Sequence, residues 1–160
     1  MKLSTRGRYG TRALLDLALH SDESPVPLKD IARRQQISLP YLEHLVMPLV
    51  SGEIIRSTRG AHGGISLLKS PEKIRLSEVI RLLEGSIAPV ECVIHPDICP
   101  RVGSCAMCDI WDEIKKAICG VLEGTTLQEL VERQRQKEAS RNGETLGSEG
   151  AVRAEQPKDT

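Results

Sequence analysis

Cysteines are the residues of this 160-residue chain most able to do chemistry, and four of its five lie close together. Six, five and two residues separate these four, which are Cys92, Cys99, Cys105 and Cys108. Prolines and a glycine interrupt the segment, and an irregular loop can bring thiolates to one point where a continuous helix could not. In a reducing compartment, four converging cysteines indicate a metal ion or an iron–sulfur cluster.

Other uses of these cysteines stay open. Structural zinc sites usually pair two Cys-x-x-Cys knuckles, and only Cys105 to Cys108 has that form. The cysteine run of bacterial ferredoxins is absent. The alternatives are therefore a zinc or thiol switch without iron, or a small dithiol redox protein, which would need a thioredoxin-like strand–helix context that is missing here. We expect Cys119 to be a packed helix residue, and His95 is a spare candidate ligand.

Charge and composition narrow the class of protein. The net charge is zero, but residues 1–70 hold 10 basic and 6 acidic side chains, whereas residues 71–160 hold 12 and 16. Such a split is expected when one end of a chain meets a polyanion. With only three aromatic residues, a base-stacking surface for single-stranded nucleic acid is excluded. Neither a membrane-spanning run nor a secretory signal is present, so we expect a cytoplasmic protein with no membrane partner and reduced cysteines.

Apolar spacing predicts three helices and a hairpin before the cysteines. The helices are expected from residue 4 or 5 to about 20, from about 27 to 36, and from 39 to about 47. Because proline breaks a helix interior, Pro48 should begin a separate turn that Gly52 ends. Residues 54–59 and 65–68 are strand-like, and a glycine-rich tip joins them. The fold class is therefore mainly α, a winged helix-turn-helix with a two-stranded wing.

Further helices are expected after the hairpin. One covers residues 76–84 and ends at Gly85, and a long one follows the cysteine-rich loop around residues 110–122. A capping box of Thr126 and Glu129 begins the last helix. From about residue 135 the chain holds almost no aliphatic side chains, so we predict a disordered tail over residues 135–160.

Candidate DNA contacts follow from this motif. The N-terminal part of the second helix of a helix-turn-helix faces base edges in the major groove, and five residues fall there: Ser38, Pro40, Tyr41, Glu43 and His44. In the wing, Arg59 suits a phosphate or minor-groove contact, because a guanidinium fits both. The remaining candidates beside the wing tip and on the first helix are Gly60, His62, Lys2 and Arg8. The alternative for Glu43 and His44 is a solvated surface.

These stretches together resemble the Rrf family of winged-helix transcription regulators, in particular its iron–sulfur cluster-binding and nitric-oxide-sensing members. The matching segments run in order over residues 1–131, and they are residues 1–10, 37–43, 59–60, 63–64, the cysteine loop and 126–131. The resemblance implies a transcriptional regulator, chiefly a repressor, and not an enzyme. It also implies a homodimer that places two winged helices on a palindromic double-stranded DNA operator.

The resemblance further divides the chain and assigns the cysteines. Residues 1–72 would form the DNA-binding domain and residues 73–134 the cluster loop and dimerisation helices, with the helix around 110–122 crossing to the partner. Cys92, Cys99 and Cys105 match the cluster ligands of the family. Relatives often carry histidine where this chain has Cys108, which suggests all-cysteine ligation within one loop and leaves 2Fe–2S against 4Fe–4S open.

Two departures from the family pattern stand out. Relatives commonly have glycine in the helix-turn-helix turn, where this chain has Gln36, and a left-handed residue other than glycine costs about 1–2 kcal/mol. We therefore expect this turn to be reshaped or strained. The spacing between Cys92 and Cys99 is also one residue longer than in the cluster-binding members.

Overall fold

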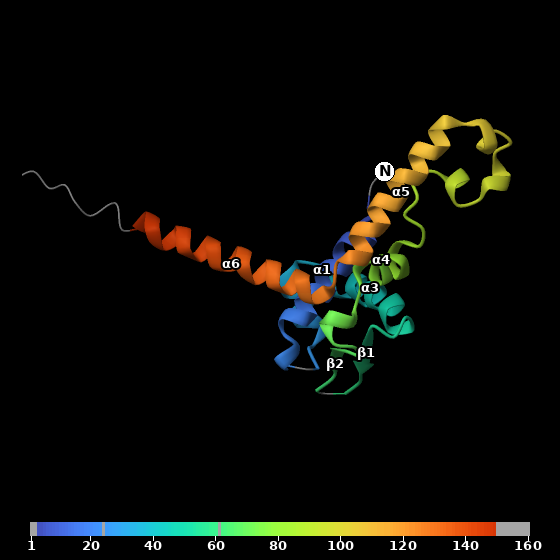
Figure 1. Cartoon of the computed structure of the whole chain (residues 1–160). Helices are drawn as coiled ribbons and strands as arrows, with labels where there is room; N and C mark the ends of the chain where they lie inside the picture. Colours follow the sequence, from blue (N-terminus) through green and yellow to red (C-terminus); the bar gives the residue numbers. More distant parts are fainter. Residues whose placement is uncertain (1–2, 24, 61, 150–160) are drawn as a thin grey trace, which may run out of the picture.

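The computed structural model describes residues 3–23, 25–60 and 62–149, which form a helical body with a wing and two projecting helices (Figure 1). Its helices and strands are α1 (Thr5–Leu19), α2 (Leu28–Gln35), α3 (Leu39–Ser51), β1 (Ile55–Thr58), β2 (Gly64–Leu67), α4 (Leu76–Glu84), α5 (Ala106–Gly124) and α6 (Leu127–Glu149). This order confirms the predicted mainly α winged helix-turn-helix. Within the described ranges, no helix combines the length and apolarity needed to cross a membrane.

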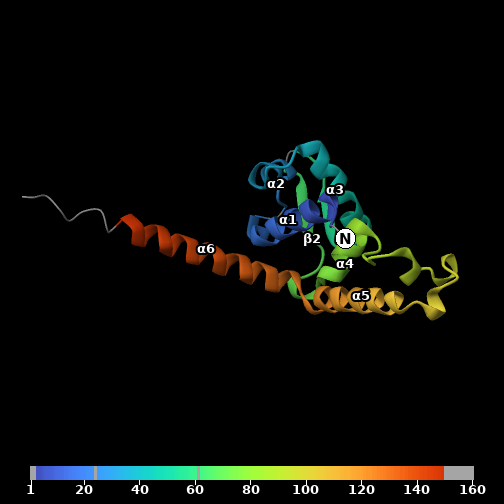
Figure 2. The same cartoon turned by 90° about the horizontal axis from the view of Figure 1, so that it is seen from above.

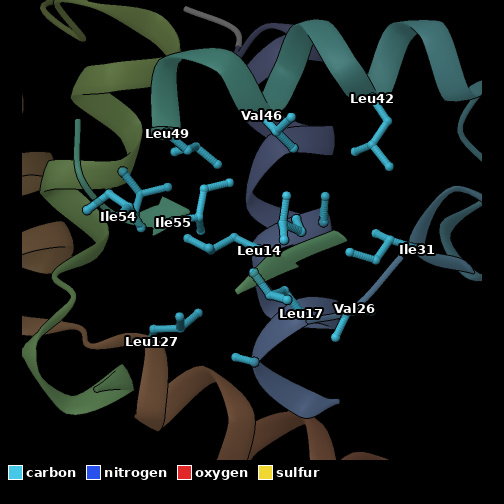
Figure 3. Close-up of a cluster of buried hydrophobic side chains, with 14 of the residues drawn as sticks. Leu14, Leu17, Val26, Ile31, Leu42, Val46, Leu49, Ile54, Ile55 and Leu127 are labelled. Carbon is cyan, nitrogen blue, oxygen red and sulfur yellow. The ribbon is translucent and has the colours of Figure 1, made fainter. Parts of the chain in front are cut away.

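Helix α1 lies at the centre of the body. It begins at Ser4, whose hydroxyl accepts hydrogen bonds from the backbone N–H groups of Arg6 and Gly7, as expected of an N-cap. Its apolar face carries Leu14 and Leu17, and α2, α3, α4, α6 and β2 all pack around it. Figure 3 shows the resulting aliphatic cluster, which no aromatic ring enters at its centre. Burial of this one face therefore orients both the helix-turn-helix and the wing.

The wing is a two-stranded antiparallel hairpin in which Ile55 pairs with Leu67 and Thr58 with Gly64. Backbone hydrogen bonds in both directions, each 2.9 Å, join Val26 to Ile65 and fasten β2 to the start of α2. Gly64 permits this contact, because a Cβ there would lie 2.3 Å from the carbonyl oxygen of Val26. The wing is thus fixed to the body through β2 as far as Gly64 and Ile65, the residues next to its tip.

The prediction that the third helix ends near Met47 is wrong, because α3 continues through Pro48 to Ser51. Proline removes one backbone donor, which leaves the carbonyl of His44 without its intrahelical partner. His44 is exposed, so water can satisfy that carbonyl. Leu45 and Leu49 are buried on either side of the proline, and their packing holds the helix together across it.

Helix α5 and the segment before it form an arm that leaves the body and returns to the same place. The backbone N–H of Leu76 donates to the carbonyl of Thr125, and that of Leu127 donates to the carbonyl of Ile74, both at 2.9 Å. Between these points, three short 3-10 turns follow Gly85 and carry the chain to the far end of α5 (Figures 1 and 2). The cysteine segment therefore lies far from the wing.

The sequence predicts a disordered tail from residue 135. The structure instead has residues 135–149 in helix α6, which extends to Glu149. Glutamine, glutamate, lysine and arginine all have good helix propensity, and side-chain pairs four residues apart support an exposed helix. Two such hydrogen bonds join Gln128 to Glu132 and Gln134 to Glu138. Residues 150–160 of the expected tail lie outside the described residues.

The turn between α2 and α3 keeps the left-handed geometry in spite of its glutamine. Gln36 has φ 55° and ψ 46°, and its backbone N–H closes the end of α2 on the carbonyls of Ala32 and Arg33. The turn is therefore strained and not reshaped.

We predict that Gln36→Gly stabilises the protein. Glycine relieves a left-handed cost of about 1–2 kcal/mol and loses part of that gain to the greater freedom of the unfolded chain, which leaves about 0.5–1 kcal/mol. Urea unfolding measures the difference. Gln36→Ala is the matched control and should not stabilise, since alanine keeps the strain; equal stabilisation by both variants would contradict the explanation.

Candidate DNA interface and cysteine centre

A buried carboxylate holds the two helices of the helix-turn-helix in place. Asp16 on α1 is 2% exposed, and Arg34 at the end of α2 donates to both of its oxygens over 2.6–3.1 Å. The Gln35 side chain adds a third donor at 2.9 Å, and Arg12 donates back to the Gln35 backbone at 3.1 Å. The carboxylate in turn raises the pKa of Arg34. This network fixes the end of α2, and hence the start of α3, against α1.

Helix α3 turns the predicted contact residues outward with one exception. Ser38, Pro40, Glu43 and His44 are exposed. The Ser38 hydroxyl makes no capping hydrogen bond, so it is free to bond to a ligand. Tyr41 is half-buried and meets Tyr9 edge-on, with ring centroids 6.3 Å apart.

The first helix places two cations beside this aromatic pair. The guanidinium of Arg8 lies 5.3 Å from the Tyr9 ring centroid and that of Arg12 lies 5.5 Å from it. Arg8 is exposed, so it keeps a hydrogen-bonding edge for solvent or phosphate. Lys2, the other basic residue predicted there, lies outside the described residues.

The wing tip presents the second group of predicted contacts. Arg59, Gly60 and His62 are all exposed, and Gly60 adopts a φ of 111° that suits glycine. A Cβ on Gly63 would lie 2.5 Å from the Thr58 carbonyl oxygen, so glycine is required to close the tip. This tight closure holds the Arg59 backbone beside the last pair of the hairpin.

The cysteines are distributed over the loop and the first turn of α5. Cys92 lies in the 3-10 turn Glu91–Val93, Cys99 ends the turn Pro96–Ile98, and Cys105 is the N-cap of α5. Cys108 lies inside α5 and is buried, which corrects the expectation that one loop holds all four. Cys119 is half-buried on α5, and His95 is exposed.

The electrostatics of Cys108 show which sulfurs lie near one another. Burial raises the pKa of its thiol, the adjacent Cys92 thiol raises it further, and Cys105 and Asp109 contribute less. Cys92 and Cys105 therefore each lie near Cys108, and Cys99 is not among the groups that act on it. Over residues 3–149, apart from positions 24 and 61, no three His, Cys, Asp or Glu side chains are arranged to hold a metal ion.

A second carboxylate connects the arm to the DNA-binding helices. Glu84 is the last residue of α4, and its Oε1 accepts from the Gly7 backbone N–H at 2.7 Å and from the Ser4 hydroxyl. A carboxylate at a helix N-terminus satisfies free N–H groups and complements the helix dipole. A Cβ on Gly7 would lie 2.3 Å from that oxygen, so a larger residue there would displace the Glu84 carboxylate. Glu84 thus joins the start of α1 to the residue that precedes Gly85 and the cysteine loop.

Sequence reasoning missed both carboxylates. Asp16 stands on the polar side of an amphipathic pattern, where an aspartate usually faces water, and Glu84 lies 77 residues from Gly7. A weak signal existed for Glu84, since Gly7 and Gly10 reduce the helix propensity of α1 and indicate that another element comes close.

Comparison with known proteins gives consistent similarities. The Rrf2 family, described as an iron-dependent transcriptional regulator, matches residues 3–133. The chain is 48% identical over 131 residues to Protein rrf2 of Nitratidesulfovibrio vulgaris, which covers 82% of this chain and 87% of that protein.

Two solved structures share the fold. CymR, the global cysteine regulator of B. subtilis, superposes with a TM-score of 0.72 at 38% identity, over 83% of this chain and 98% of that one. The IscR of T. potens superposes with a TM-score of 0.69 at 37% identity, over 84% and 88%. The similarity therefore spans the wing, the arm and the start of α6.

We predict that Asp16→Ala lowers the free energy of unfolding by about 3 kcal/mol, because it leaves the Arg34 guanidinium, 24% exposed, without its partner. Thermal unfolding checks this. Asp112→Ala is the control, since its ion pair with Lys116 is as short, 2.7 Å, but is open to solvent. Similar losses in both variants would show that burial of the Asp16 network contributes nothing.

Proposed function

Because this chain belongs to the Rrf2 family and is a transcriptional regulator, not an enzyme, we propose that it is a homodimeric DNA-binding repressor governed by an iron–sulfur cluster. The observation that carries the proposal is the set of four cysteines between α4 and the first turn of α5. DNA would be bound by the exposed face of α3 and by the wing tip. The arm would carry both the cluster and the partner subunit.

The DNA-binding half of the proposal is supported by the geometry of α3 and the wing. Ser38, Glu43 and His44 are exposed at the start of α3, where a recognition helix meets base edges. Arg59 lies on the free end of the hairpin and suits a phosphate or the minor groove. Tyr41 would act indirectly, by its contact with Tyr9, and not by reaching a base.

The donor set fits an iron–sulfur cluster in kind and in number. Cys92 and Cys105 each lie near Cys108, and Cys99, which follows the exposed residues 94–98 of the same loop, would complete the set. These four thiolates would hold the cluster, which supplies a charge and a set of covalent links sensitive to oxidation, iron loss or nitric oxide. Loss of protons accompanies such binding, since thiolates are the ligands. Absorption and electron paramagnetic resonance spectra of the anaerobic protein would distinguish a 2Fe–2S from a 4Fe–4S cluster.

Exposure of the arm supports a homodimer. Of the 19 residues of α5, only Cys108 is buried, although the helix carries an apolar stripe that includes Ile110, Ile118 and Val121. Beside it, a groove of about 590 Å³ between α1, α4, α5 and α6 is lined by Leu3, Ile80 and other aliphatic residues. A contiguous apolar surface rimmed by polar residues is typical of a protein–protein interaction site. A second copy of α5 would cover it and space two recognition helices on a palindromic operator.

Glu84 offers a short physical route from the cluster to the DNA. A change in the loop would act on Gly85 and α4, and Glu84 would pass it to the first turn of α1. Because α1 carries Asp16 and the whole helix-turn-helix packs on it, a small rotation would alter how both α3 helices meet the operator.

A thiol switch without iron is the second candidate, and the proximity of Cys92 to Cys108 favours it. The two differ in one cheap measurement. Anaerobically purified protein with a cluster absorbs visible light and contains iron and sulfide, whereas a zinc or thiol switch is colourless.

We predict that each of Cys92→Ala, Cys99→Ala, Cys105→Ala and Cys108→Ala lowers bound iron and bleaches the anaerobic chromophore, because each removes a ligand. Cys119→Ala is the control and should leave iron, sulfide and absorption nearly unchanged. Iron and sulfide that remain equal in Cys108→Ala would contradict the four-cysteine assignment and direct attention to His95 or a carboxylate.

We further predict opposite effects at Glu43 and Arg59. Glu43 can accept from a cytosine amino group while it repels phosphates, so Glu43→Ala should relax sequence preference while total affinity holds or rises. Arg59→Ala should weaken binding to all sequences and reduce the salt dependence by about one phosphate contact. Binding to a duplex selected from a random library, and to its point variants at several salt concentrations, measures both. Uniform loss of affinity in Glu43→Ala would instead assign Glu43 to the stability of the motif.

A further inference from the structure

The recognition helix has an unusual composition for its position. Helix α3, Leu39–Ser51, contains no arginine, lysine, asparagine or glutamine. These are the side chains that bind guanine or adenine edges with two hydrogen bonds in the major groove. The outward face of α3 must therefore obtain sequence information from other chemistry, even though the rest of residues 1–70 is rich in basic side chains.

Four of the exposed residues of α3 form one stripe, whereas Leu39 and Ser51 are exposed at the two ends of the helix. Pro40, Glu43, His44 and Met47 stand at i, i+3, i+4 and i+7, which is the spacing at which recognition helices place residues against bases. Met47 is 61% exposed, more than any other large apolar side chain of α3. Its neighbours Leu45 and Val46 are buried in the core, whereas Met47 faces away from it. Met47 does not line the groove beside α5, so the proposed dimer contact does not account for it.

We propose that α3 reads pyrimidines, and that Met47 is a specificity residue that recognises thymine by packing against its C5-methyl group. The methyl group of thymine is the one apolar feature of a base pair in the major groove. A flexible thioether fits such a target without demanding a fixed geometry. Glu43, one turn before Met47, is suited to the cytosine amino group, the other distinctive group of a pyrimidine. The inference rests on the proposed DNA-binding function and deepens it.

Thymine-to-uracil replacement tests the inference, because it removes the methyl group and nothing else. A duplex is first selected from a random library with the full-length protein, and each thymine of the duplex is then replaced singly by uracil. For the wild-type protein, we expect one position in each half-site where the replacement weakens binding about four-fold, the value of one buried methyl group. Met47→Ala should lose the same factor on the thymine duplex and be insensitive to uracil at that position.

Two controls separate the methyl contact from a general effect of substitution. Met47→Leu keeps an apolar side chain and should retain sensitivity to uracil at the same position. Ser51→Ala changes another exposed residue of α3 and should behave as the wild type at every position. Circular dichroism and thermal unfolding of each variant check that its helical content and stability match those of the wild type.

Each outcome has a distinct meaning. If no duplex is enriched, the proposed DNA-binding function fails and the inference fails with it. If a duplex is enriched but the wild-type protein tolerates uracil everywhere, or if Met47→Ala keeps the wild-type sensitivity, Met47 does not read thymine and the proposed function stands without it. Sensitivity to uracil that disappears in Met47→Ala alone establishes the contact.

Discussion

The burial of one carboxylate group, that of Asp16, is the constraint on which the DNA-binding half of this protein depends. Asp16 is almost completely buried, and a buried charge is tolerated only where hydrogen-bond donors surround it. Arg34 and Gln35 supply them from the last turn of α2, so α2 has a single rotation and height at which the charge is satisfied. Gln36 then turns the chain within one residue, and the direction of α3 follows.

The two ends of α1 are held in different ways, and the difference suits their roles. Near its C-terminus, the Asp16 network is enclosed and makes the helix-turn-helix one rigid unit. At its N-terminus, Glu84 meets Ser4 in an exposed position, where a hydrogen bond exchanges readily with water. The contact between Glu84 and the start of α1 is therefore open to solvent, although α4 itself packs against α1 through the buried core.

Most helices and the wing could be predicted from the sequence. The features that could not be predicted depend on contacts that local sequence patterns do not reveal. Apolar periodicity located α1, α2, α4 and the wing because each buries one continuous face. The end of α3 was predicted wrongly because proline favours a helix break at Pro48. The packing of Leu45 and Leu49 overrides that preference. Composition likewise predicted disorder where helix propensity and side-chain pairs extend α6. Asp16 and Glu84 were missed because their partners lie on other elements, and only the folded chain brings a carboxylate to its donors.

The backbone pairing of Ile74 with Leu127, and of Leu76 with Thr125, makes the arm an excursion from a closed base. Because the two ends of the arm are fixed in this way, residues can be added to or lost from the loop without displacing either end from the body. The additional residue between Cys92 and Cys99 that the family resemblance implies would be a change of this kind. A fold with such a base lets the length and sequence of the loop vary while the helix-turn-helix and the wing keep their positions on the body.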